Sequence, residues 1–127
     1  METNELTREI IGAAMRIHSA LGPGLLESAY RVCLGRELEL RGLPFKAEIA
    51  LPVRYQGVIV DAGYRIDLLV EDTVIVELKA SARTSPVDEC QLLSYLRLAG
   101  KPVGLIINFH VEHLRDGIKR MVNNYRG

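Results

Sequence analysis

The stretch IDLLVEDTVIVELKA (residues 66–80) decides the fold, because it indicates two apolar strands joined by a short polar turn. Each strand carries charge inside its apolar run: Asp67 lies in the first, and Glu77 and Lys79 lie in the second. A charge inside a covered strand is costly unless it pairs with an opposite charge or binds a metal ion. The hairpin therefore poses a structural question and a chemical one.

The length of the turn decides whether the two carboxylates meet. A three-residue loop at 71–73 places Asp67 directly opposite Glu77, and it also sets Arg65 opposite Lys79. A two-residue loop would put the carboxylates on opposite faces of the sheet. We expect the three-residue register, because it gathers the charges on one face. The apolar residues that it keeps together on the other face are Ile66, Leu68, Val74, Val76 and Leu78.

Two carboxylates directly across a sheet repel each other, and a divalent cation removes that penalty. Mg²⁺ typically binds one or two carboxylates, with water and substrate phosphate completing its shell. Asp67 and Glu77 would supply the carboxylates, and the backbone carbonyl of Leu78 is a candidate further ligand. Lys79 would lie beside the ion, where it can orient a water molecule or stabilise negative charge at phosphorus. The alternatives are a charged, solvent-facing strand and a metal-free cluster in which Arg65 and Lys79 neutralise the carboxylates.

Other segments supply helices and further strands. Apolar residues at helical spacing predict helices over 5–21 and 25–41, and Ser85-Pro86 indicates the start of a third, over 86–99. A last helix is expected over about 112–125, where Arg115, Lys119 and Arg126 would form a solvated face or a phosphate-contacting stripe. The expected strands are 46–55, 58–70, 74–80 and 103–109, with a turn at Gln56-Gly57.

This order predicts an α/β protein with a mixed central sheet flanked by helices. The segments 74–80, 86–99 and 103–109 can form a parallel strand–helix–strand crossover. A chain of 127 residues fits one domain, 1–127.

Composition limits the functional classes. The 16 basic and 16 acidic residues give a formal net charge of zero, which argues against a protein that coats nucleic acid through bulk electrostatics. A nuclease is still compatible, because it needs only a local basic rim around an acidic metal site. The polar N-terminus, the two separated cysteines, expected to be free thiols, and the lack of a long apolar run predict a cytoplasmic protein with no membrane association.

Two helical residues are candidates for the same site. Glu27 falls inside the apolar arc of its helix, so it stabilises the helix dipole, pairs with Arg31, or points at a site. Gln91 shares a helix face with Tyr95, and it could orient a carboxylate or water, or bond to backbone. Taken alone, each residue is explained most simply by a structural role.

Six short motifs occur along nearly the whole chain. They are GLLESAY (24–30), YRID (64–67), ELKA (77–80), QLLSYL (91–96), GLIINF (104–109) and DGIKR (116–120). In this order and at these spacings the chain resembles the GxxExxY proteins, a small-domain family within the PD-(D/E)XK nuclease superfamily. Ile66 stands where the usual motif has proline.

The resemblance implies a restriction-endonuclease-like αβββαβ core. In such a core Asp67 and Glu77 hold Mg²⁺ or Mn²⁺, Lys79 assists the attacking water, and Glu27 and Gln91 join the site. We therefore expect a metal-dependent phosphodiester hydrolase acting on nucleic acid, with DNA as the expected substrate. The alternative is a non-catalytic nucleic-acid-binding or protein-assembly module that keeps the fold. A homodimer and a protein partner for targeting are both compatible with the sequence.

Overall fold

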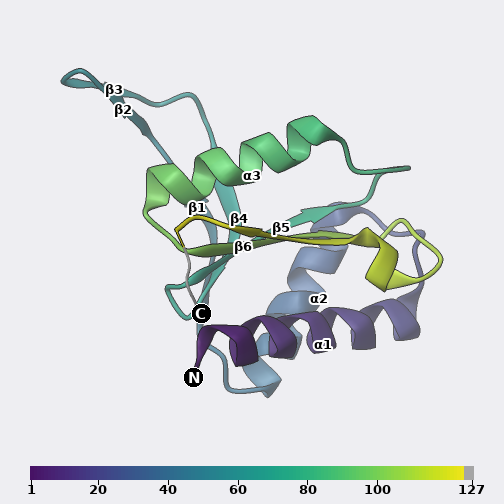
Figure 1. The fold of residues 1–127 in the computed structure, drawn as a ribbon. Coiled ribbons are helices and arrows are strands. Elements are labelled where there is room, and N and C mark those ends of the chain that lie inside the picture. Colours follow the sequence, from purple (N-terminus) through teal and green to yellow (C-terminus); the bar gives the residue numbers. More distant parts are fainter. Residues whose placement is uncertain (125–127) are drawn as a thin grey trace.

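The computed structural model describes residues 1–124 and has an α/β architecture with two sheets. Its elements are α1 (Thr3–Leu21), α2 (Glu27–Leu40), β1 (Phe45–Ala50), β2 (Val53–Tyr55), β3 (Val58–Val60), β4 (Arg65–Val70), β5 (Val74–Lys79), α3 (Pro86–Ala99), β6 (Val103–Asn108), the 3-10 turn η1 (Leu114–Gly117) and β7 (Ile118–Val122). Five strands form the main sheet in the spatial order β1-β4-β5-β6-β7. Helices α1 and α2 cover one face and α3 covers the other (Figure 1). The expected mixed sheet between helices is confirmed.

Local chemistry accounts for the ends of the helices. The Glu2 side chain accepts hydrogen bonds from the first turn of α1, and Gly22 ends that helix with a positive φ of 75°. Ser85 caps α3, with Pro86 at its first position, as the sequence predicts. Gly100 ends α3 in the left-handed conformation.

The hairpin register is confirmed. Strands β4 and β5 pair antiparallel, with Val70 opposite Val74 and Leu68 opposite Val76, so residues 71–73 form the turn. The predicted crossover is also present, because β5 and β6 pair parallel with α3 between them in the chain. The most buried strands, β5 and β6, therefore lie at the centre of the sheet.

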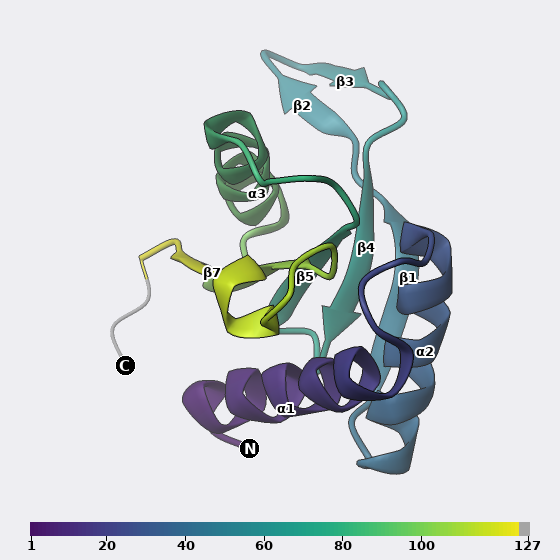
Figure 2. The same cartoon turned by 90° about the vertical axis from the view of Figure 1, so that its right-hand side faces the viewer.

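The two long strands expected over 46–55 and 58–70 are each interrupted. The chain leaves the main sheet after Ala50 and rejoins it at Arg65, and in between β2 and β3 form a separate hairpin. This hairpin projects beyond the rest of the molecule, as the turned view shows (Figure 2). Proline at position 52 cannot donate a ladder hydrogen bond, which is one reason that the strand stops there.

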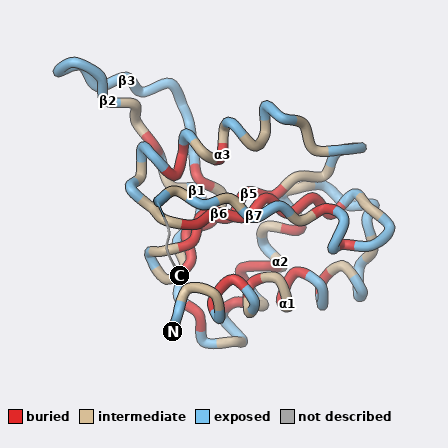
Figure 3. Tube along the Cα trace, viewed as in Figure 1, coloured by how far each residue is buried: buried red, intermediate tan, exposed pale blue. Residues whose placement is uncertain are grey.

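Two buried layers lie on opposite faces of the sheet. Leu68, Val74, Val76 and Leu78 lie together on one face, as expected, and pack with α1 and α2. Ile66 was expected on the same face but packs with the α3-side cluster. The strict alternation fails here beside a distortion in the neighbouring strand, where Glu48 has a φ of 51°. Figure 3 shows burial concentrated in the central strands, whereas the β2–β3 hairpin is exposed.

The helix expected over 112–125 is wrong. The chain makes the short turn η1 and then strand β7, which pairs antiparallel with β6. Helical spacing of the apolar residues was misleading, because the open edge of β6 offers backbone partners that no local pattern reveals. Arg115 and Lys119 therefore do not share a helix face, and residues Tyr125 and Arg126 of the expected helix lie outside the described residues.

Gly117 offers a test of this C-terminal arrangement. A Cβ at position 117 would meet the backbone carbonyl of Asn108 and the side chain of Val111. Gly117→Ala should therefore lower the unfolding free energy by about 2 kcal/mol, measured by urea denaturation. Gly24→Ala is the matched control, because nothing lies within 4 Å of its added Cβ. Equal stability of the two variants would contradict the described seating of η1.

Candidate active site

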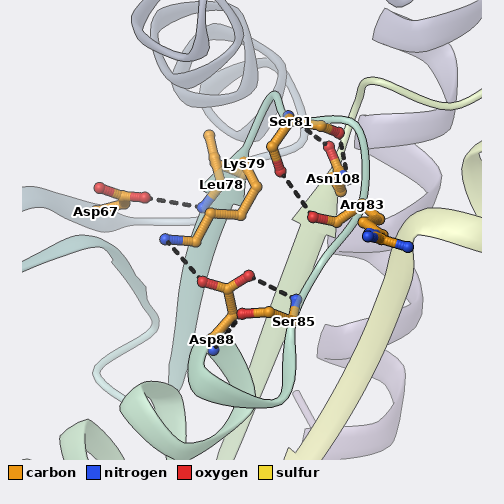
Figure 4. Close-up of polar contacts among 8 residues, drawn as sticks. All are labelled: Asp67, Leu78, Lys79, Ser81, Arg83, Ser85, Asp88 and Asn108. Atoms are coloured by element: carbon orange, nitrogen blue, oxygen red, sulfur yellow. Dashed lines mark hydrogen bonds and ion pairs between the residues drawn. The ribbon is translucent and has the colours of Figure 1, made fainter.

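The β4–β5 ladder changes character at its open end. Beyond the Leu68–Val76 pair, side-chain carboxylates replace backbone carbonyls as hydrogen-bond acceptors. The Asp67 N–H donates to Glu77 Oε2 at 2.9 Å. The Leu78 N–H donates to Asp67 Oδ2 at 2.8 Å (Figure 4). The two strands are thus joined by reciprocal carboxylate-to-backbone hydrogen bonds, which bring both acidic groups together.

Glu77 is the most strongly perturbed acid of the pair. Glu77 is 5% exposed. Its pKa is raised from 4.5 to about 8, mainly by burial and then by the charge of Asp67. Burial also raises the pKa of Asp67, although the Leu78 N–H and the Lys79 charge oppose that shift. The two carboxyl groups therefore interact directly, and the charge of Asp67 disfavours the ionised form of Glu77. Without a cation, the pair favours holding a proton at neutral pH.

Lys79 links this pair to the start of α3. Its Nζ lies 3.9 Å from Asp88 Oδ1, while the other oxygen of Asp88 accepts from the Ser85 N–H at 2.9 Å (Figure 4). The Ser85 hydroxyl in turn accepts from the Asp88 N–H, which completes a capping box. The sequence predicted the Ser85 cap, but it did not predict that the Asp88 carboxylate also contacts Lys79.

The loop that follows Lys79 is anchored by a buried amide. Asn108 is 1% exposed, and its Nδ2 donates to the Ser81 carbonyl at 3.0 Å. Its Oδ1 accepts from the N–H groups of Ser81 and His110. These hydrogen bonds tie the end of β5 to the end of β6, so they restrict the path of the chain between Lys79 and Ser85.

The position of Glu27 is set by contacts of Tyr30, one turn further along α2. The Tyr30 hydroxyl donates to the Gly22 carbonyl and accepts from the Leu25 N–H, and its ring stacks on Phe109 at 4.1 Å. This arrangement holds the loop that precedes α2 and therefore places Glu27 as the first residue of that helix.

The electrostatic surroundings of Glu27 identify its neighbours. Burial raises its pKa, Asp67 raises it further, and Lys79 and Arg31 lower it. Arg31 makes its ion pair with Glu48, at 3.5 Å, rather than with Glu27. The structure therefore brings Glu27, Asp67 and Lys79 into one electrostatic cluster.

Gln91 lies on α3 in a hollow that none of Glu27, Asp67 and Lys79 lines. It is half-buried and lines this hollow together with Tyr64 and Tyr95. The pKa of Tyr95 is raised by burial and then by Glu77, with further contributions from Tyr64 and Asp67, which places its phenol near the acidic pair. No hydrogen bond joins the Gln91 side chain to another residue in the described part of the chain. The backbone-bonded alternative for this residue thus has no support.

The donor atoms suit a divalent ion of the magnesium type. Residues 1–124 contain no group of three or more His, Cys, Asp or Glu side chains able to hold an ion by themselves. Mg²⁺ commonly uses only one or two carboxylates, so the pair Asp67 and Glu77 is a sufficient side-chain set. The Leu78 N–H points toward β4, and the carbonyl of a strand residue points the same way, so that oxygen also faces Asp67.

The metal-free ion-pair alternative fits less well. Arg65 is exposed and pairs with Ala50 on β1, and the β4–β5 ladder ends at the Leu68–Val76 pair, before it reaches Arg65 and Lys79. No ion pair within residues 1–124 joins Arg65 to Asp67 or Glu77. Lys79 remains as a neighbouring cation, and it is shared with Asp88.

The sheet order and the carboxylate pair at the end of β4 and β5 define an α/β domain with a restriction-endonuclease-like architecture. Residues 4–121 match the family model of the PD-(D/E)XK nuclease superfamily. The chain therefore belongs to that superfamily. Comparisons with curated proteins and with solved structures gave no significant match. No helix in the described residues is both long and apolar enough to cross a membrane.

The raised pKa of Glu77 predicts how metal-free stability depends on pH. Because the folded state holds a proton that the unfolded state releases above pH 4.5, stability should fall as pH rises from about 4.5 to 8. Glu77→Gln removes the titrating group and with it this loss of stability at high pH. With a chelator present, its melting temperature should exceed that of the wild type by several degrees at pH 8.5 and should match it at pH 4.

Glu39→Gln is the control for this pH experiment, because the Glu39 side chain is 58% exposed and pairs only at the surface with Arg36. It should shift the melting temperature little at either pH. A wild type whose stability relative to Glu77→Gln is the same at pH 4 and 8.5 would contradict the burial of an acidic group at this position.

Proposed function

We propose that the protein hydrolyses phosphodiester bonds of nucleic acid, with DNA as the expected substrate and Mg²⁺ or Mn²⁺ as the cofactor. The observation that carries the proposal is the carboxylate pair Asp67 and Glu77, joined across β4 and β5 with Lys79 beside it. Membership of a nuclease superfamily supports it. The motif at 24–30, which positions Glu27 at this site, supports placement in the GxxExxY branch.

The proposed roles follow from the position of each group. In this proposal Asp67, Glu77 and the Leu78 carbonyl supply the oxygen ligands of the ion, and the hydrogen bonds that join β4 to β5 hold both carboxyl groups in place. A divalent ion there would supply positive charge that neutralises the carboxylates and polarises a phosphate oxygen. Lys79 orients the attacking water and stabilises the charge that develops at phosphorus. Glu27 and Gln91 complete the polar lining and hold water in position.

Asp88 is proposed as a positioning residue. One of its oxygens contacts Lys79 and the other is fixed by the Ser85 N–H. A lysine side chain has several rotatable bonds, so an anchor of this kind restricts the positions that its ammonium group can take. Asp88 thereby acts through Lys79 rather than on the substrate.

A non-catalytic module is the second candidate. It is favoured by the backbone hydrogen bonds to Asp67 and Glu77, which satisfy one oxygen of each carboxylate without any ion. The formal net charge of zero also favours it, because a binding role through bulk electrostatics would need excess positive charge. Such a module would assemble with a second copy or with another protein.

A cleavage assay separates the two candidates. Single- and double-stranded DNA and RNA are incubated with the protein in Mg²⁺ or Mn²⁺, beside Asp67→Asn and Lys79→Ala. We expect metal-dependent cleavage that falls by at least about a hundredfold in both variants, because each removes charge used at the reacting phosphate. Failure of the wild type to cleave any substrate, together with no calorimetric binding of Mg²⁺ or Mn²⁺, would falsify the enzymatic proposal.

The role of Asp88 is tested by a variant that keeps the helix cap. Asp88→Asn retains an oxygen for the Ser85 N–H but removes the charge that faces Lys79. The expected result is a decrease in kcat of about tenfold with KM little changed, because Lys79 loses its orientation.

Ser85→Ala is the matched control for Asp88→Asn. It removes the hydroxyl that accepts from the Asp88 N–H, so it should lower stability by about 1 kcal/mol with a smaller effect on kcat. If the kcat of Asp88→Asn equals that of the wild type, Asp88 serves the helix alone.

A further inference from the structure

A hollow of about 420 Å³ opens beside the candidate active site, between α3 and the base of the β2–β3 hairpin. We call it the tyrosine groove. The Tyr64 and Tyr95 rings lie 6.0 Å apart and are tilted by 59°. Its lining includes Val53, Tyr64, Gln91, Ser94, Tyr95 and Leu98.

Both walls of the tyrosine groove carry a residue that lies three positions from a site residue in the chain. On one wall, Tyr64 lies directly before β4, three residues ahead of Asp67 in the chain. On the other, Gln91 follows Asp88 by three residues on α3, and Asp88 contacts Lys79. The effect of Glu77 on the pKa of Tyr95 agrees with this placement. A nucleic-acid strand whose phosphate lies at Asp67 and Glu77 would therefore have the groove beside it.

We propose that the tyrosine groove receives an unpaired nucleobase from the strand whose phosphodiester lies at Asp67 and Glu77. Single-stranded or locally unpaired nucleic acid is then the substrate class. This inference rests on the proposed function and adds the form of the substrate to it.

The chemistry of the lining favours a base. Tyr64 is 42% exposed, so its ring has surface available for stacking, and the Gln91 amide can both donate to and accept from a base edge. The faces of a base inside a duplex are covered by its neighbours, so only an unpaired base can enter. Because the net charge is zero, stacking would supply affinity that an excess of lysine and arginine supplies in other proteins.

Binding without cleavage tests the groove directly. The probe is a single-stranded DNA oligonucleotide that carries one 2-aminopurine, titrated in Ca²⁺ and followed by fluorescence quenching. A matched oligonucleotide replaces that base with an abasic site, and a fully paired duplex of the same sequence is the third ligand. We expect the wild type to bind the single strand about tenfold more tightly than either of the other two.

The variants assign the effect to one ring. Tyr64→Leu should weaken binding of the 2-aminopurine strand by about tenfold and leave the abasic strand unchanged, whereas Tyr64→Phe keeps the ring and should behave as wild type. Tyr55→Leu is the matched control, because Tyr55 is 70% exposed on the projecting hairpin and does not line the groove. Melting temperatures establish that each variant is folded.

Several results would overturn the inference. These are equal affinity for duplex and single strand, equal weakening of both single strands by Tyr64→Leu, and no binding at all. If Tyr64→Leu instead dissociates a dimer in sedimentation and leaves oligonucleotide binding unchanged, the surface belongs to a second copy of the chain.

The groove and the hydrolysis proposal can fail separately. If the protein cleaves nucleic acid but Tyr64→Leu does not change cleavage, the hydrolysis proposal stands and the proposal for the groove is wrong. If binding depends on the base but no substrate is cleaved, the proposal for the groove stands and the hydrolysis proposal is wrong.

Discussion

The structure depends on one exchange of hydrogen bonds, in which the Asp67 carboxylate accepts from the Leu78 N–H and the Glu77 carboxylate accepts from the Asp67 N–H. These bonds replace the backbone ladder at the point where β4 and β5 separate. They place two acidic groups side by side, where burial raises the pKa of each and the charge of Asp67 raises the pKa of Glu77 further. A site that binds a cation is the simplest physical reason for such an arrangement.

The surrounding elements act mainly to hold this exchange in place. Tyr30 fixes the entry to α2 and so the position of Glu27, and Asn108 fixes the chain that leaves β5. Asp88 joins the cap of α3 to Lys79. Each of these three residues serves the fold and the site together, so a stability change and an activity change at such positions have to be measured separately.

Much of the fold could be predicted, and the failures have specific causes. The register of β4 and β5 was predictable because, with a side-chain period of two, only the three-residue turn gathers the charged residues on one face. Strand β7 was not, since residues 118–122 become a strand only when the edge of β6 is present to receive them. The position of Ile66 was not predictable either, because the distortion at Glu48 lies in a different strand.

By itself the sequence determined the hairpin, the proximity of its two carboxylates and the start of α3, because these features depend on contacts between residues close together in the chain. Tertiary structure decided which distant groups join them. Glu27 is the first residue of α2, Tyr64 directly precedes β4, and Asp88 lies on α3. The packing of these elements on the sheet brings Glu27 near Asp67 and Lys79, Tyr64 near Tyr95, and Asp88 near Lys79. A local pattern carries no information about that packing, because long-range contacts form only when the sheet and helices come together.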